Sequence, residues 1–161
     1  MSANKLARIG VVAALYAVLT LALPSFAYGP IQFRLSEVMT LLAFIDPFYI
    51  LPLTLGCAIS NLGSPFGMVD VVVGSFASFL ALYAMSKTKN LFLASLWPTF
   101  FCFIIGLEIL VLSEEPINFF LITGQIMISE FIVVTIIGIP FLKAIMKNKY
   151  VMKMLKNTPS V

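Results

Sequence analysis

Long apolar runs, separated by short breaks that contain proline or polar residues, follow one another along the whole chain. A helix that crosses a bilayer needs about 20 largely apolar residues. The runs therefore predict six transmembrane helices, with approximate bounds 6–23, 33–46, 48–60, 69–86, 91–112 and 117–146. The second and third runs are short for complete spans, so we expect them to be tilted, partly re-entrant or extended by a turn at each end. The pattern indicates one all-α transmembrane domain over residues 1–161.

Both ends of the chain carry basic residues. Lys5 and Arg8 precede the first apolar run, an arrangement that secretory signal peptides share. Because five more runs follow, we interpret the first run as a retained transmembrane helix. At the other end, a basic tail at 147–161 continues the last helix. Its amphipathic pattern is typical of a segment that lies at the lipid surface.

The composition agrees with a membrane protein. Apolar residues make up 61% of the 161 residues, and only 11% are charged. Soluble domains carry about 25% charged residues, so an ordinary water-soluble fold is excluded. The chain has no histidine, and its two cysteines, Cys57 and Cys102, lie inside apolar runs. We expect no disulfide framework, no metal site and no cofactor, and the sequence contains no Walker-type phosphate loop.

Basic residues decide the predicted orientation, because cytoplasmic loops collect Lys and Arg. Six spans place both termini in the cytoplasm. Nine of the ten basic residues then lie inside, and only Arg34 lies outside. Five spans would put the two basic ends on opposite sides of the membrane. The charge pattern therefore supports six spans and this polarity.

Two segments near the predicted outer surface carry polar residues that would cost several kcal/mol in contact with lipid. The segment IQFRLSE at 31–37 holds Arg34 and Glu37 three residues apart, on one face of a helix. They form either a local ion pair that anchors a loop or one lip of a binding site. The segment NLGSPFGMVD at 61–70 holds Asn61 and Asp70 around an irregular turn. That turn either caps two helices or faces a cavity.

Three more polar residues lie in the last two predicted helices: Glu108, Gln125 and Glu130. No Lys or His accompanies them, so each buried carboxylate needs a hydrogen-bond donor or must become neutral. The donor is either a neighbouring helix or a ligand with several N–H groups. In the predicted topology all these polar positions lie toward the outer half, and we expect them to converge on one outward-facing pocket.

The first helix carries a stripe of small residues that includes Ala13 and Ala17. Small residues let helices approach closely in lipid. The stripe indicates either packing within the bundle or contact with a partner protein.

The segments IQFRLSE, GCAISNLGSP and GMVDVVVGSFAS, taken with the six predicted helices, resemble the QueT family. Its members are regarded as S components, the substrate-binding subunits of energy-coupling-factor (ECF) importers for queuosine precursors. The resemblance implies capture of substrate from outside and docking on a transmembrane coupling subunit that two ATPase subunits energise. It implies that Ala13 and Ala17 belong to the docking face. The implied substrate is a 7-deazaguanine, either preQ1, preQ0 or queuine.

A guanine-like base presents N1–H and an amino group on one edge, and a carboxylate accepts both. We hypothesise that Glu108 or Glu130 binds this edge and that a second acid meets an aminomethyl group. An amide or guanidinium would donate to O6, and an aromatic ring would stack on the base. The predicted binding residues are Glu130, Glu108, Gln125, Asn61, Asp70, Arg34, Glu37 and Phe33.

Other functions stay open at this stage. A stand-alone secondary transporter or channel often contains internal repeats, and none is visible here. An enzyme is not expected, because no histidine, metal cluster or Ser/Lys dyad lies at depth. An S component for a different vitamin is a further alternative. No nucleic-acid partner is expected.

Overall fold

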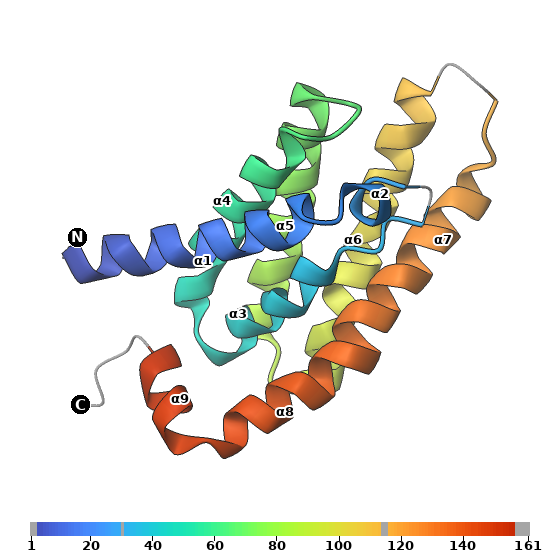
Figure 1. The fold of residues 1–161 in the computed structure, drawn as a ribbon. Helices are drawn as coiled ribbons and strands as arrows, with labels where there is room; N and C mark the ends of the chain where they lie inside the picture. The colour runs from blue at the N-terminus through green and yellow to red at the C-terminus, as the bar shows by residue number, and fades with distance from the viewer. Residues whose placement is uncertain (1–2, 30, 114–115, 157–161) are drawn as a thin grey trace.

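The computed structural model describes residues 3–29, 31–113 and 116–156, and regular structure in this part of the chain is entirely helical (Figure 1). Two 3-10 helices, η1 and η2, and one π-helix, η3, interrupt the α-helices. The elements in chain order are α1 (Ala3–Leu21), α2 (Pro24–Ala27), η1 (Leu35–Leu41), α3 (Leu42–Ile45), η2 (Pro47–Tyr49), α4 (Ile50–Asn61), α5 (Met68–Lys87), α6 (Leu91–Leu112), α7 (Phe119–Glu130), η3 (Phe131–Gly138), α8 (Ile139–Lys147) and α9 (Lys149–Leu155).

Four helical segments are long and apolar enough to cross a bilayer: Ala3–Leu21, Met68–Lys87, Leu91–Leu112 and Phe119–Lys147. The prediction of an all-helical membrane protein is thus confirmed. The second and third predicted spans are shorter elements, because η1 and α3 cover only Leu35–Ile45 and α4 has 12 residues. Six complete spans, and the cytoplasmic location of both termini, therefore stay predictions.

Caps and prolines fix the helix ends. The helix predicted at 91–112 has those bounds, and the Asn90 side chain caps it by accepting hydrogen bonds from the backbone N–H groups of Phe92 and Leu93. The first helix ends at Leu21 instead of residue 23, because Pro24 starts the separate helix α2. The second predicted helix begins at Leu35 instead of residue 33. The tail forms α9, and residues 157–161 lie outside the described part.

The helices pack in the order α1, α4, α5, α6 and α7, and η1 lies between α1 and η3 (Figure 1). Helices α7, η3 and α8 follow one another without a break. This arrangement surrounds η1 with helices, so polar side chains on η1 face the interior of the bundle. Both Ser36 and Glu37 are buried there.

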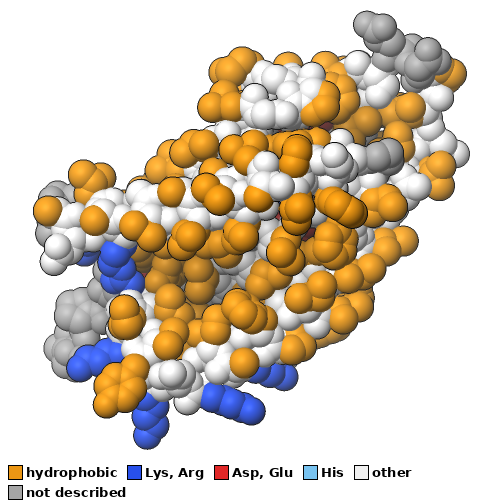
Figure 2. All heavy atoms as spheres, in the orientation of Figure 1, with side chains coloured by type: hydrophobic (Ala, Val, Ile, Leu, Met, Phe, Trp, Pro, Cys, Tyr) orange, Lys and Arg blue, Asp and Glu red, His pale blue; other side chains and the backbone are white. Residues whose placement is uncertain are grey.

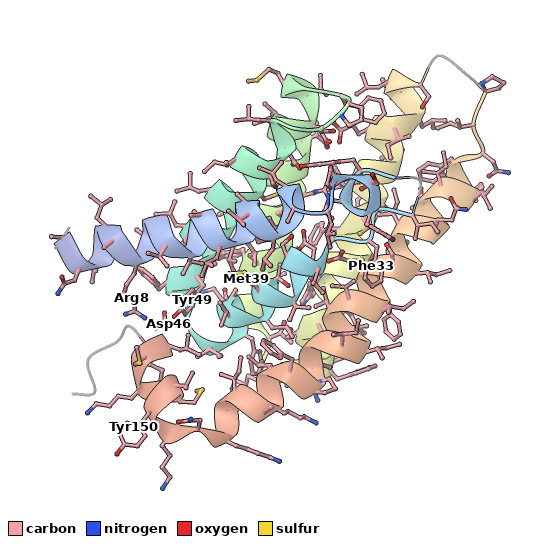
Figure 3. All side chains as sticks on the ribbon, in the orientation of Figure 1. Arg8, Phe33, Met39, Asp46, Tyr49 and Tyr150 are labelled. Atoms are coloured by element: carbon pink, nitrogen blue, oxygen red, sulfur yellow. The ribbon has the colours of Figure 1, made fainter. Side chains whose placement is uncertain are left out.

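The beginning of α1 and the end of α9 meet at one end of the bundle. The Arg8 guanidinium donates to the carbonyl oxygens of Met154 and Leu155 at 2.5 and 3.3 Å, and the Tyr49 hydroxyl donates to Leu155 O at 2.9 Å. Figure 3 shows Arg8, Asp46 and Tyr49 together beside α9. On the face drawn in Figure 2, the basic side chains gather at this same end. The structure therefore brings the two basic ends of the chain together.

Helix α1 approaches α4 most closely at Gly56. A Cβ atom at this position would lie 2.8 Å from Tyr16 Cβ and 2.9 Å from the Ala13 carbonyl oxygen. Only glycine leaves room for this contact. The small residues Ala13 and Ala17 are 5% and 4% exposed, so most of their surface is used in packing inside the bundle.

We predict that Gly56→Ala lowers the thermal stability of the detergent-solubilised protein. Alanine is the better helix former by about 1 kcal/mol, but the overlap with Tyr16 opposes it by about 1–3 kcal/mol. Gly10→Ala is the control, since a Cβ at Gly10 meets nothing within 4 Å. Equal melting temperatures for the two variants would contradict the close contact.

Candidate substrate-binding site

A polar cavity lies between η1, α5, α6 and α7. Small residues on α5 and a mixed face of α6 form two of its walls, and acids, an amide and a guanidinium form the rest. Its lining residues are Gln32, Arg34, Glu37, Thr40, Gly74, Ala77, Ser78, Ala81, Pro98, Phe101, Cys102, Ile105, Ile126 and Glu130. The cavity volume is about 50 Å³, which is room for a few water molecules. A bicyclic ligand therefore requires the walls to move apart.

Arg34 is held in place by three neighbours. Its Nε donates to the Ala27 carbonyl oxygen at 3.2 Å, and one terminal nitrogen donates to Asn61 Oδ1 at 3.1 Å. The guanidinium also lies over the Tyr28 ring, 5.3 Å from its centroid. These contacts direct a positive charge to the cavity wall. A local ion pair with Glu37 is not among the described contacts, so the loop is anchored by other groups.

Asn61 positions Arg34 without lining the cavity. Its Nδ2 donates to the Asp70 carbonyl oxygen at 3.0 Å, while its Oδ1 accepts from Arg34. The amide lies directly over Gly74, where a Cβ atom would collide with Nδ2. Gly74 is thus needed for the amide to reach Arg34. The turn at 61–70 connects α4 to α5 without a side-chain cap on α5, and Asn61 at its start supports the site.

Glu37 connects the cavity to α1. The buried Tyr16 hydroxyl donates to the Glu37 carboxylate. One helical turn further on, the hydroxyls of Thr20 and Ser36 are joined by a 2.6 Å hydrogen bond. These two contacts attach η1 to α1, and they leave Glu37 with a defined orientation at the cavity.

Within the described part of the chain, Glu130 is the cavity acid whose carboxylate accepts no hydrogen bond. It is 7% exposed, and no hydrogen bond to its carboxylate occurs among the described residues. The π-helix η3 begins at the next residue, Phe131; single π turns often occur at functional sites. The preceding residue, Ser129, donates to the Ile31 carbonyl oxygen at 2.6 Å. A free carboxylate is therefore held against the loop that carries Arg34.

Gln32 is a cavity residue with unusual backbone geometry. Its φ angle is +48°, in the left-handed region that non-glycine residues rarely adopt. Such strain is frequent at ligand sites. The sequence contained no signal for this angle. It also gave no signal for Thr40, Ser78, Phe101 or Cys102 as lining residues, because their types are ordinary for membrane helices.

The predicted binding residues therefore separate into groups. Arg34, Glu37 and Glu130 line the cavity, and Asn61 supports it. Gln125 is partly buried on α7 but does not line the cavity. Phe33 lies in a separate surface groove with Phe26 and Ile31, and the lining aromatic residue is Phe101.

The remaining two predicted residues, Asp70 and Glu108, lie close to each other and outside the lining. Both are buried, with 5% and 6% of their surface exposed.

In the described part of the chain, no three or more Asp, Glu or Cys residues are arranged to hold a metal ion.

Comparisons with known proteins identify the family of this chain. The family described as QueT transporter matches residues 6–147. The chain belongs to the QueT transporter family. The Queuosine precursor transporter QueT of Lactococcus lactis subsp. cremoris (strain MG1363) is 36% identical over 140 residues, which cover 76% of this chain and 81% of that protein. No solved structure gave a significant match.

Membership of the QueT family makes this a transporter with several apolar helices and confirms the resemblance carried by the loop segments. The molecule also has a second hollow, separate from the cavity. An apolar groove of about 470 Å³ runs along α1 and α4, lined by Ile9, Gly10, Ala13, Ala14, Ala17, Val18, Leu21, Leu55 and Ile59. The small-residue stripe of α1 thus packs against α4 and also forms part of an open surface.

We predict that Tyr16→Phe destabilises the protein by about 1–3 kcal/mol, because it leaves the buried Glu37 carboxylate without the phenol donor. Thermal unfolding in detergent measures the change. Tyr150→Phe is the control, since it removes the same hydroxyl from a side chain that is 84% exposed. If both variants unfold at the wild-type temperature, the Tyr16–Glu37 contact does not stabilise the fold.

Proposed function

We propose that this protein is the substrate-capturing subunit of an ATP-driven importer and that it binds a queuosine precursor, a 7-deazaguanine such as preQ1, preQ0 or queuine. The observation that carries the proposal is the cavity in which Arg34, Glu37 and Glu130 lie together. The relative from Lactococcus lactis is named as a queuosine precursor transporter, which supports the same substrate class.

The cavity offers the groups that a guanine-like base needs. Glu130, whose carboxylate accepts no hydrogen bond from the described residues, accepts N1–H and the exocyclic amino group in a two-pronged contact. Gln32 and Arg34 lie across the same cavity and donate to O6. Phe101 supplies the aromatic face for stacking. The small residues Gly74 and Ala77 on α5 leave space for the ring when the walls part.

The ATP-driven mechanism requires other subunits. The sequence holds no Walker-type phosphate loop, so we propose that a transmembrane coupling subunit and two ATPase subunits supply the energy, as in ECF importers. The groove on α1 and α4, with Ala13 and Ala17 at its base, is the proposed docking face. Partner helices pack on such small-residue surfaces in lipid.

The proposed topology has both termini in the cytoplasm of a bacterial cell. The contact between Arg8 and α9 supports it, since it holds the two basic ends at one end of the bundle. Basic residues favour the cytoplasmic side. In this orientation two short segments complete the six proposed crossings: the first is η1 with α3, and the second is α4. Other helices cover both segments.

We predict that Glu130→Gln weakens 7-deazaguanine binding about 10- to 100-fold, because the amide keeps the shape but loses the charged acceptor. Isothermal titration of the purified protein measures the affinity. Ile128→Ala is the control on the same helix, with a side chain that is 62% exposed and outside the lining.

Wild-type affinity in Glu130→Gln would remove this residue from the site. A wild-type protein that binds no deazaguanine but binds another vitamin would replace the proposed substrate. Uptake that continues when the ATPase subunits are inactivated would favour a stand-alone secondary transporter.

We predict that Ala14→Trp abolishes uptake and leaves substrate affinity unchanged, because the indole fills the groove on α1 and not the polar cavity. Leu15→Trp is the matched control: Leu15 is the next residue on α1, is 53% exposed and does not line the groove. Co-purification of the coupling subunit reports docking, and whole-cell accumulation reports uptake. Equal uptake by the two variants would contradict this docking face.

A further inference from the structure

Asp70 and Glu108 continue the two cavity walls toward one end of the molecule. On α5 the lining residues Gly74, Ala77, Ser78 and Ala81 share one helix face, and Asp70 lies four positions before Gly74 on that face. On α6 the lining residue Ile105 is followed three positions later by Glu108. Three residues of helix rise about 4.5 Å. Both acids therefore lie about one turn beyond the cavity, at the end of the bundle where α5 starts and α6 ends (Figure 1).

No N–H or hydroxyl group of the described residues donates to Glu108 there. Both carboxylate oxygens are shielded from solvent and accept no hydrogen bond from the described residues, and the side chain is 6% exposed. Its neighbour is the carboxyl group of Asp70, whose Oδ1 lies over Gly74, 3.3 Å from where a Cβ would stand. Buried polar groups are nearly always paired, so this pair lacks a donor.

The charges around the cavity point to the kind of donor. Arg34 lies within electrostatic range of Glu37, Asp70, Glu108 and Glu130. Two of its five N–H groups donate to Ala27 and Asn61. Four acidic residues thus lie within electrostatic range of one guanidinium, and a ligand that brings further N–H donors would suit this group of acids.

We propose that Asp70 and Glu108 form a subsite for a primary ammonium group on the ligand. The inference rests on the proposed function and makes it more specific: the preferred substrate is a 7-deazaguanine that carries an aminomethyl group. An ammonium has three N–H donors and no acceptor, which matches two carboxyl groups that lack a donor. The base occupies the cavity against Glu130, and the ammonium extends one turn along α5 and α6.

Selectivity of the wild-type protein is the first test. Titration of the purified subunit with the aminomethyl compound (preQ1) and with the nitrile compound (preQ0) compares a charged with an uncharged substituent on the same base. The aminomethyl compound should bind about 10- to 100-fold more tightly. Equal affinities, or tighter binding of the nitrile, would overturn the subsite.

Substitutions of single acids show which residues cause the preference for the aminomethyl compound over the nitrile compound. In Glu108→Gln and in Asp70→Asn, the ratio between the two affinities should fall toward one. In Glu130→Gln both affinities should fall by a similar factor, and the ratio should persist. If Glu108→Gln retains the wild-type ratio, the ammonium is bound elsewhere. Circular dichroism and melting temperature establish that each variant is folded, and the wild-type comparison decides the matter even where a variant does not fold.

Two further outcomes are distinguishable. A wild-type protein that binds neither compound contradicts the proposed function itself, whereas binding of both without preference contradicts only the subsite. Replacing sodium chloride by choline chloride tests whether the pair holds an alkali cation instead. If the affinity of the wild-type protein for the aminomethyl compound is the same in both salts, the pair binds the ammonium. If the wild-type protein loses affinity in choline chloride and Glu108→Gln does not, the pair holds sodium, and the proposal is overturned.

Discussion

A guanidinium surrounded by carboxyl groups inside an apolar helical bundle is the interaction on which this structure depends. Charges in a low-dielectric interior are stable only when paired or hydrogen-bonded. Arg34 meets that condition through Ala27, Asn61 and the Tyr28 ring, and it lies within electrostatic range of four acids. Two of the five Arg34 N–H groups bind Ala27 and Asn61, so the others, together with the nearby acids, are available to a ligand.

This constraint explains the irregular helices in the middle of the molecule. The 3-10 helix η1 carries Glu37 to the interior, and the π-helix η3 starts immediately after Glu130. Gly74 makes room for the Asn61 amide that orients Arg34. Irregular backbone at membrane depth persists where protein or a wet cavity covers it. Here the surrounding helices α1, α5, α6 and α7 supply that cover and also form the walls of the site.

The helical membrane architecture and the bounds of α6 could be predicted from sequence, because apolar runs and caps such as Asn90 are local signals. Arg34, Glu37 and Glu130 could also be recognised, since charged residues in apolar runs are rare. The lining role of Phe101 could not be predicted, because it depends on which helices face each other. The left-handed backbone angle of Gln32 could not be predicted either, because no residue pattern indicates it. Phe33 lies on neither wall of the cavity but lines a different surface groove from its sequence neighbour Arg34, so its contact with the ligand stays a prediction. The short elements η1, α3 and α4 left the number of complete spans undecided.

Protection of a native cysteine tests most directly whether the ligand occupies this cavity. Cys102 lines it, whereas the buried Cys57 does not. Purified protein is treated with a small methanethiosulfonate reagent, and modification of each thiol is followed by mass spectrometry with and without a 7-deazaguanine. If the ligand occupies the cavity, saturating ligand slows modification of Cys102 and leaves the modification rate of Cys57 unchanged. Modification of Cys102 at the same rate in both conditions, while the ligand is bound, would contradict this occupancy.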